Sequence, residues 1–413
     1  MRIWRTLPPT AAILSLDDLL CGFTALTGER RHLTELESDI KSHFHVKYVF
    51  LISSGKAALA VILSALRSLS SARRVVIPAY TCFSVPSSII KAELQVTLCD
   101  IDSSTLGFDM DKLGQCLNQE TLCVVPNHLF GIPSPIEEVK ALCRPKGIFV
   151  VEDAAQAMGG TYQGKKLGTL GDVGFFSFGR GKNITCVSGG AIITNSDEIG
   201  QAIEQQYDLL QPPSRREELR DLGQAILMSL FIHPSLYWFP ASLPFLNLGK
   251  TIFYRDFPVK KLSHVKVGLL RRWKDQLKNS SDARRNISRA FRKCFGDAGL
   301  RNVDVPSLRY PILVESHEIR DRLYQLSRKR GLGLSVMYPC PVNETNELRH
   351  AFQGQVFSLA KDISERLIAL PTHSFVTLKD TERISALVRE ASDSGSSISK
   401  PRSQPIPAST RTP

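Results

Sequence analysis

Short apolar runs alternate with helix-like segments between residues 48 and 195. Segments such as 56–66 and 134–143 repeat apolar residues at helical spacing. The apolar runs are rich in β-branched residues, and we expect strands at 75–79, 95–101, 121–127, 147–153, 173–178 and 190–195. Apolar strands separated by helices are typical of a mostly parallel sheet with helices on both faces. The sequence therefore predicts an α/β fold, whose ligands bind beyond the carboxyl ends of the strands.

The C-terminal part of the chain has a different pattern. We expect a strand at 309–314, a helix at 318–331 and a terminal helix at 379–391, which together would build a smaller α+β domain. The predicted limits are 1–250 for the large domain, including an N-terminal segment 1–28, then 251–392 for the small domain, and 393–413 for a tail. The tail is rich in Ser and Pro, a composition typical of disorder.

Residues 225–249 form an apolar connection that contains no Asp, Glu, Lys or Arg. Its length approaches the ~20 residues of a membrane span. Three prolines interrupt it, however, so we expect a buried connection or an oligomer interface: Pro234, Pro240 and Pro244. A peripheral membrane contact stays an alternative, because basic residues follow the segment, namely Lys250, Arg255, Lys260 and Lys261.

Composition limits the kinds of partner and the cellular compartment that we expect for this protein. The 413 residues carry a formal net charge of +12, which suits an anionic partner such as a phosphorylated substrate, a membrane surface or nucleic acid. The basic stretch 271–293 is accompanied by no recognition motif, so we expect a solvated helix face and no nucleic-acid partner. Nine cysteines form no CxxC pair, so neither a metal site nor a disulfide framework is expected. Because Asp17 and Asp18 interrupt the N-terminal apolar stretch, we expect no signal peptide and a cytoplasmic protein.

The segment 150–194 holds residues that suggest chemistry. Asp153 ends one expected strand, and Lys182 follows another in a loop rich in Gly and Ser. A pyridoxal-phosphate enzyme needs this pair, since the lysine amine condenses with the cofactor aldehyde and the carboxylate keeps the pyridine nitrogen protonated. Taken singly, each residue has a simpler explanation. An acidic residue at a strand end usually forms a turn, and a lysine in such a loop is usually exposed.

A second element of this chemistry is the helix start at Ser53, Ser54 and Gly55. Backbone N–H groups at a helix start, together with small hydroxyl side chains, can cradle a phosphate. Most Ser-Gly helix starts only cap the helix, so this element is weak evidence by itself.

The order and spacing of several segments resemble the DegT/DnrJ/EryC1/StrS sugar aminotransferases, which are fold-type-I pyridoxal-phosphate enzymes. The resemblance extends from about residue 29 to 387. The segments that carry it are SSGKAAL (53–59), PAYTCFSVPSSII (78–90), HLFGIP (128–133), EDAAQA (152–157), GDVGFFSFGRGK (171–182), SGGAIIT (188–194), YPCPV (338–342) and RLIALPTHS (366–374). Eight segments in one order make the resemblance specific for fold and cofactor.

The resemblance implies a role for each matching residue. Lys182 would bind the cofactor pyridoxal 5′-phosphate covalently and move a proton between Cα and C4′. Asp153 would pair with the ring nitrogen, and Gln156 would lie near the ring and its 3-hydroxyl. The phosphate would be bound by small residues, namely Ser177, Ser54 and Gly55.

The chain also departs from the family pattern. Lys56 replaces the Thr of the usual SGT, where it would neutralise the phosphate or face solvent. Cys82 stands where an aromatic side chain commonly stacks on the ring, and Phe83 would point the other way on an extended backbone. Ser-Gly-Gly at 188–190 replaces GEGG, and the segment 253–268 lacks the usual asparagine. We therefore expect a divergent member.

The resemblance implies a homodimeric aminotransferase that moves an amino group from glutamate to a keto sugar. The sugar would be nucleotide-linked and serve polysaccharide or saccharide synthesis. Some relatives carry histidine in place of the lysine and dehydrate the sugar, and Lys182 argues against that branch. Two alternatives stay open: another pyridoxal-phosphate reaction, such as elimination or transfer to a different acceptor, and an inactive scaffold at a membrane surface.

Overall fold

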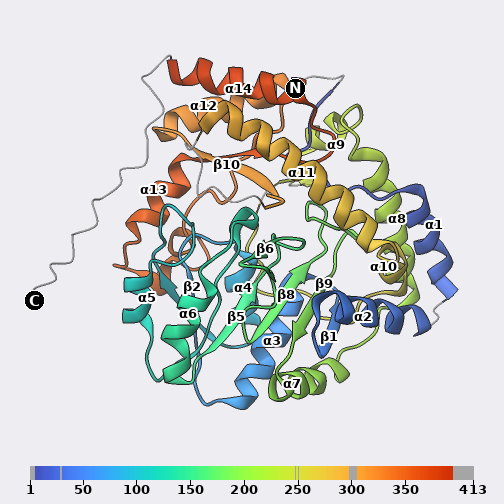
Figure 1. Ribbon diagram of the computed structural model, residues 1–413, viewed down its shortest axis with the longest axis vertical. Helices are drawn as coiled ribbons and strands as arrows, with labels where there is room; N and C mark the ends of the chain where they lie inside the picture. Colours follow the sequence, from blue (N-terminus) through green and yellow to red (C-terminus); the bar gives the residue numbers. More distant parts are fainter. Residues whose placement is uncertain (1–4, 28–29, 247, 250, 297–304, 394–413) are drawn as a thin grey trace, which may run out of the picture.

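A seven-stranded sheet lies at the centre of the molecule, with the strand order β1–β9–β8–β5–β4–β2–β3 (Figure 1). Its strands are β1 (Tyr48–Ile52), β2 (Arg74–Pro78), β3 (Gln95–Cys99), β4 (Thr121–Val124), β5 (Phe149–Asp153), β8 (Val173–Ser177) and β9 (Gly190–Thr194). The four pairings from β8 to β3 are parallel. Only β9 runs against its neighbours β1 and β8. The predicted α/β fold with a mostly parallel sheet is confirmed.

This computed structural model describes residues 5–27, 30–246, 248–249, 251–296 and 305–393. Of the predicted tail, residues 394–413 lie outside the described residues. The strand β1 was not predicted, although Ser53 and Ser54 mark the end of its apolar run. Two further strands, β6 (Thr161–Tyr162) and β7 (Lys165–Lys166), form a small separate hairpin.

Helices cover both faces of the central sheet. Along β1 the side chains alternate, so that Phe50 and Ile52 join one core cluster while Val49 and Leu51 join the other. The first face is covered by α3 (Gly55–Leu69), α4 (Ser84–Lys91) and α7 (Asp197–Asp208). The second is covered by α2 (Arg30–Phe44), α5 (Met110–Cys116), α6 (Ile136–Cys143) and α10 (His264–Leu269). Each fully buried Leu, Ile or Val on these helices contributes roughly 1.5–3 kcal/mol to folding.

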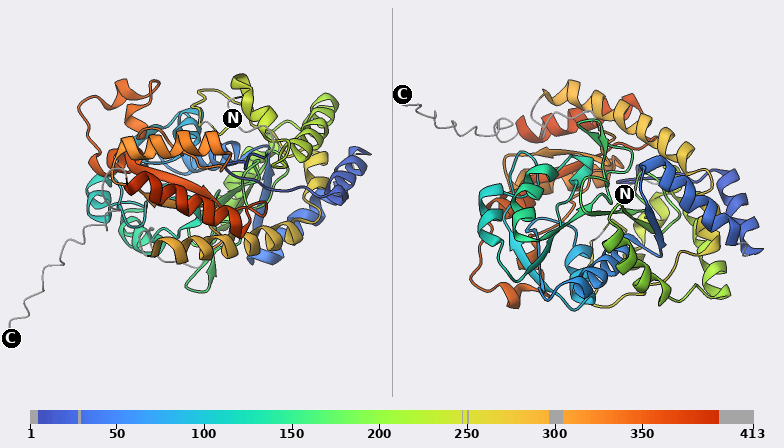
Figure 2. Two further views of the ribbon diagram at one scale, coloured as in Figure 1. Left: turned by 90° about the horizontal axis from the view of Figure 1, so that it is seen from above. Right: turned by 60° about the horizontal axis from the view of Figure 1, so that its bottom comes forward.

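A second, smaller core surrounds the antiparallel pair β10 (Arg309–Leu313) and β11 (Leu367–Pro371). It includes residues of α12 (His317–Arg330) and α14 (Leu378–Asp393), while α13 (Ser358–Arg366) packs beside α12. The strand and two helices predicted for this part are therefore present. Helix α11 (Trp273–Phe295) joins the two cores, since Trp273 lies in the large core and Phe291 in the small one (Figures 1 and 2). The domain limits at 250 and 392 stay predictions.

The apolar segment 225–249 is broken into short pieces. Helix α8 (Arg215–Phe231) ends three residues before Pro234, and α9 (Trp238–Ser242) and the turn η4 (Pro244–Leu246) follow. Among the described residues, no helix combines the length and the apolar character that crossing a membrane requires. Several apolar side chains of this region are exposed: Ile226, Leu227, Leu230, Leu236, Phe239, Phe245 and Leu246. We call these seven side chains the α8–α9 apolar surface. Helix α1 (Leu16–Thr24) packs beside α8 at the same edge of the molecule (Figure 1).

Candidate active site

The predicted site residues gather at one edge of the central sheet. The parallel strands β2, β4, β5 and β8 all end there, and β1 ends beside them, because Ile52 and Ser177 both pair with Gly190 at the start of β9. Asp153 is the last residue of β5, and Ser177 is the last residue of β8. This is the edge at which open α/β sheets bind their ligands.

The start of α3 forms a tight contact with the end of β8. Ser54 caps the helix, and its Oγ accepts a hydrogen bond from the Ala57 N–H at 3.2 Å. A Cβ atom on Gly55 would lie 2.8 Å from Ser177 Cβ and 3.0 Å from Ser177 Oγ. Only glycine therefore fits at position 55 without a shift of the backbone. The arrangement brings free N–H groups of a helix start and two hydroxyls together, which is what a phosphate site requires.

Lys182 lies beside this cradle. A Cβ atom on Gly179 would lie 3.5 Å from Ser177 Oγ and 3.8 Å from Lys182 Cγ, so the two side chains flank Gly179. Neighbours hold the loop: Thr10 Oγ1 donates to the Gly181 carbonyl at 2.8 Å, and the Lys182 carbonyl accepts from Arg284 at 3.3 Å. Burial lowers the pKa of the Lys182 amine, although Cys82 and Asp153 act in the opposite direction. Burial therefore favours the neutral amine more than in an exposed lysine, and the neutral amine is the form that attacks an aldehyde.

Asp153 is buried, and one of its oxygens is already engaged. Its Oδ1 accepts a hydrogen bond from the Ala155 N–H at 3.0 Å, while Oδ2 accepts none from the described residues. Burial raises the pKa of Asp153, whereas the Ala155 N–H, Lys182 and His128 favour the charged form. A protonated ring nitrogen opposite Oδ2 would add a strong, charge-assisted hydrogen bond and stabilise the carboxylate further.

A second buried carboxylate supports the loop between β5 and β8. Glu152 Oε1 accepts hydrogen bonds from His128 Nε2 at 2.7 Å and from Gly168 N at 2.5 Å. Its Oε2 accepts from Leu170 N at 2.6 Å and from Gly171 N at 2.9 Å. Glu152 lies within the segment EDAAQA, but the sequence alone predicted no role for it. Its four hydrogen bonds tie the end of β5, where Asp153 lies, to His128 and to the loop 168–171.

Both the oxygen and the nitrogen of the Gln156 side-chain amide form hydrogen bonds. Its Oε1 accepts from the Phe130 N–H at 3.2 Å, and its Nε2 donates to the Tyr338 hydroxyl at 3.1 Å. Tyr338 was not predicted as a site residue, although it begins the segment YPCPV that contributes to the family resemblance. Asn127 is a further site residue that the sequence did not predict. Its backbone forms an isolated parallel β-bridge with that of Asp153. Among the described residues, its buried Oδ1 has no hydrogen-bond partner.

The two unusual residues, Lys56 and Cys82, lie at the margin of the site. Lys56 Nζ lies over two aromatic rings, 4.4 Å from the centroid of Tyr254 and 4.6 Å from that of Phe257. The Cys82 thiol accepts a hydrogen bond from Ser84 Oγ at 3.0 Å. The backbone at Phe83 is helical rather than extended, and its ring packs 6.2 Å from that of Tyr338. The roles of Lys56 and Cys82 toward a cofactor stay predictions.

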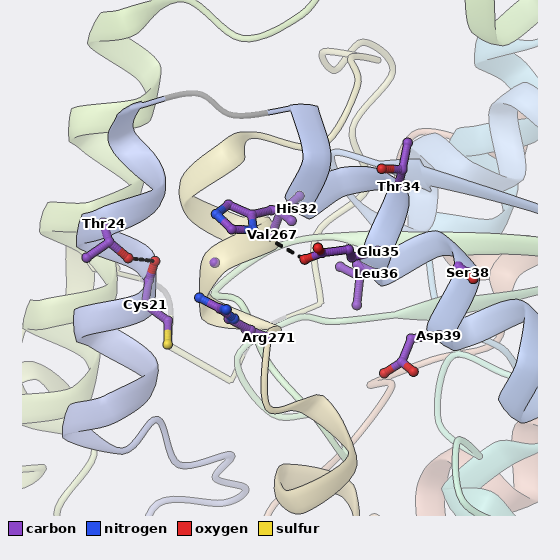
Figure 3. A pocket seen from close by; sticks show the side chains of 11 residues that line it. Cys21, Thr24, His32, Thr34, Glu35, Leu36, Ser38, Asp39, Val267 and Arg271 are labelled. Carbon is purple, nitrogen blue, oxygen red and sulfur yellow. Dashed lines mark hydrogen bonds and ion pairs between the residues drawn. The ribbon is translucent and has the colours of Figure 1, made fainter.

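A cavity of about 480 Å³ lies elsewhere, between α1, α2 and α10 (Figure 3). Arg271 and Glu35 point into it, and His32 lies 3.4 Å from Glu35. None of the predicted site residues lines this cavity. It is therefore separate from the chemistry at the sheet edge.

The sheet-edge site defines a class of protein: an α/β fold with a half-buried lysine, a buried carboxylate and a helix start with two hydroxyl groups at its strand ends. The model of the DegT/DnrJ/EryC1/StrS aminotransferase family matches residues 16–221 and 262–389. The chain belongs to this family, whose members use pyridoxal phosphate.

Individual relatives are distant. GDP-perosamine synthase of Vibrio cholerae is 30% identical over 169 residues, which cover 41% of this chain and 46% of that protein. GDP-4-keto-6-deoxy-D-mannose 3-dehydratase of Yersinia pseudotuberculosis is 29% identical over 170 residues, or 40% of this chain and 43% of that protein. The chain thus spans about half the length of the curated relatives it matches. The PLP-form of Spr1654 from Streptococcus pneumoniae has the same fold, with a TM-score of 0.74 at 19% identity over 94% of this chain and 99% of that one.

Proposed function

We propose that the chain is an aminotransferase that moves an amino group from glutamate to a nucleotide-linked keto sugar, in polysaccharide or saccharide biosynthesis. The observation that carries this proposal is the grouping of Lys182, Asp153 and the Gly55–Ser177 cradle at one sheet edge. The relatives named above include both a GDP-sugar synthase and a GDP-sugar dehydratase. Retention of a lysine at position 182 favours amino transfer over dehydration.

The residues present fit pyridoxal phosphate. The start of α3 with Ser54, Gly55 and Ser177 would hold the phosphate, and a side chain larger than glycine would fill that cradle. Asp153 would hold a proton on the ring nitrogen through its free Oδ2. When bound, the cofactor supplies an electron sink that makes the donor Cα–H acidic.

The chain's own residues would do the remaining work. Lys182 would attach the cofactor through its neutral amine, and after displacement by the donor it would carry the proton between Cα and C4′. Burial favours the neutral amine and so supports both steps. Gln156 would stay in place beside the ring, because Phe130 N and the Tyr338 hydroxyl restrain its amide.

A labelling experiment tests the proposal. The holoenzyme is incubated with ¹⁵N-glutamate and a panel of nucleotide-linked 4-keto and 3-keto sugars, and the products are examined by mass spectrometry. Amino transfer predicts a labelled amino sugar and one equivalent of 2-oxoglutarate. A sugar product without label would favour elimination, and no turnover with any donor would favour the inactive scaffold.

We also propose a homodimer in the cytoplasm, with the α8–α9 apolar surface covered by a second copy. The nine cysteines are free thiols, which supports a reducing compartment. Two of the basic residues expected to favour a membrane contact are engaged within the chain. Lys260 pairs with Glu217 at 2.8 Å, and Lys261 lies 4.5 Å from the Tyr207 ring centroid. Lys260 and Lys261 are therefore less available to anionic lipids, and the surface itself consists of apolar side chains.

Light scattering coupled to gel filtration tests this interface. The wild type should elute with the mass of two chains, and Ile226→Gln combined with Leu230→Gln should elute as one chain. A monomeric wild type that floats with vesicles containing anionic lipid would support the membrane contact instead.

A further inference from the structure

Four polar side chains form a row at the carboxyl ends of neighbouring strands: Ser177 on β8, Asp153 on β5, Asn127 after β4 and Thr81 after β2. Each lies two residues after a member of the core cluster that α3 covers, namely Phe175, Val151, Val125 and Ala79. Residues two apart on a strand point to the same face of the sheet. The row therefore lies on the α3 face, with the phosphate cradle at its Ser177 end.

Asn127 lies directly beside Asp153 in this row. The Asp153 N–H donates to the Pro126 carbonyl at 2.9 Å, and the His128 N–H donates to the Asp153 carbonyl at 3.1 Å, which together form the parallel bridge. Residues paired in this way have their side chains on one face, and neighbouring strands lie about 4.8 Å apart. The Asn127 side chain is therefore within reach of a group that binds the Asp153 carboxylate.

The Asn127 amide is held on its nitrogen side only. Its Nδ2 donates to Thr81 Oγ1 at 3.1 Å, and both side chains are buried. The Asn127 Oδ1 accepts no hydrogen bond from the described residues, although only 6% of the residue is exposed. A buried acceptor without a donor is unfavourable, because it gives up its hydrogen bonds to water and receives none in return. We therefore expect a ligand to supply the donor.

The neighbouring free oxygen indicates which kind of donor fits. Asp153 Oδ2 also accepts no hydrogen bond from the described residues, so two accepting oxygens lie side by side. Other buried amides differ in this respect. Asn343, in the turn η6 (Val342–Glu344), likewise has a buried Oδ1 without a partner, but it lies outside the row of strand ends. A carboxylate and an amide oxygen together favour a positively charged N–H group.

We propose that Asn127 Oδ1 and Asp153 Oδ2 together bind the protonated ring nitrogen of the cofactor, so that Asn127 is a second cofactor-binding residue at this edge of the ring. The inference rests on the proposed function. Two accepting oxygens beside the N–H group stabilise its cationic form. Asn127 would thereby help to keep the ring protonated, which is the state that withdraws electrons most strongly.

Equilibrium dialysis with two ligands tests the proposal. Wild type, Asn127→Leu and the control Asn343→Leu are compared for pyridoxal phosphate and for its 1-deaza analogue, in which a C–H group replaces the ring nitrogen. The analogue keeps the aldehyde for Lys182 and the phosphate for the cradle. Asn127→Leu should bind pyridoxal phosphate about tenfold more weakly than the wild type, and the analogue equally well. The control should match the wild type with both ligands.

A second readout reports the protonation of the ring directly. In ¹⁵N NMR spectra of holoenzyme that carries ring-labelled cofactor, the pKa of the ring nitrogen should be about one unit lower in Asn127→Leu than in the wild type, since a tenfold preference for the protonated form corresponds to one unit. A substitution that only loosened the site would weaken both ligands. If Asn127→Leu does not fold by circular dichroism, the same measurements on Asn127→Ala decide.

The inference is overturned if the substitution weakens both ligands equally, or if the affinity for pyridoxal phosphate and the pKa of the ring nitrogen both stay unchanged. Failure of the proposed function looks different: the wild type would bind the cofactor but release no 2-oxoglutarate from glutamate. A wild type that binds no pyridoxal phosphate would overturn both.

Discussion

The most specific structural prediction concerns Glu152, whose two oxygens accept four hydrogen bonds inside the protein. Its side chain and that of His128 have no exposed surface. His128 Nδ1 accepts the Ser134 N–H at 2.9 Å, so Nε2 carries the proton and donates to Glu152. The substitution Glu152→Gln keeps the shape but replaces one accepting oxygen with an NH₂ group, which cannot accept a hydrogen bond.

The magnitude follows from the donors that lose their partner. Whichever oxygen is replaced, two of the four N–H groups are left buried and unsatisfied, at about 1–3 kcal/mol each. We expect Glu152→Gln to lower the free energy of unfolding by about 4 kcal/mol, a large part of the ~5–15 kcal/mol of a typical protein. Cofactor affinity should fall as well, because Glu152 fixes the backbone next to Asp153.

Urea denaturation of the apoprotein, followed by tryptophan fluorescence, measures the change. Glu137→Gln is the matched control, since Glu137 forms an exposed ion pair with Lys165 at 3.0 Å and should contribute less than about 1 kcal/mol. A loss below 1 kcal/mol for Glu152→Gln would refute the reasoning, because the four hydrogen bonds could not then be made as the structure shows them.

Two further predictions concern the cradle and the pH dependence of stability. Gly55→Ala places a Cβ atom 2.8 Å from Ser177 Cβ, so equilibrium dialysis should show at least tenfold weaker binding of pyridoxal phosphate and a smaller change for pyridoxal. The control is Gly114→Ala, because a Cβ atom on Gly114 would have no neighbour within 4 Å. Equal effects of Gly55→Ala on both ligands would contradict a phosphate cradle. His373 is buried, and burial lowers its pKa to about 3, so between pH 6.5 and 3 the unfolded chain binds a proton that the folded chain does not. His373 should therefore lower the free energy of unfolding by up to about 1.4 kcal/mol for each unit of decreasing pH. In urea titrations between pH 6 and 4, the free energy of unfolding of His373→Gln should depend less steeply on pH than that of the wild type. An unchanged pH dependence would contradict the lowered pKa of His373.

The fold was largely predictable, because apolar strands and amphipathic helices are local patterns. Six strands of the sheet appear where the β-branched runs predict them, and the resemblance named the family correctly. The strand β1 was missed because a five-residue apolar run does not by itself distinguish a strand from a helical segment. The antiparallel direction of β9 also has no local signal.

Without the resemblance, only the part of the candidate site that follows strand ends could be predicted from the sequence. Asp153 and Ser177 end their strands, so their proximity follows from a parallel sheet. Tyr338 lies 182 residues after Gln156 in the chain and reaches it through tertiary packing.

The central claim is that Lys182 carries the cofactor and that an amino acid donates to it. The most direct measurement is the absorbance spectrum of purified protein with pyridoxal phosphate, before and after glutamate, for wild type, Lys182→Ala and the exposed control Lys165→Ala. We expect a visible band in the wild type and the control, which glutamate removes with release of 2-oxoglutarate. Reduction of the wild type with borohydride should leave the cofactor permanently attached to Lys182. A Lys182→Ala variant that keeps the band and its response to glutamate, or a wild type that shows no band, would contradict the account.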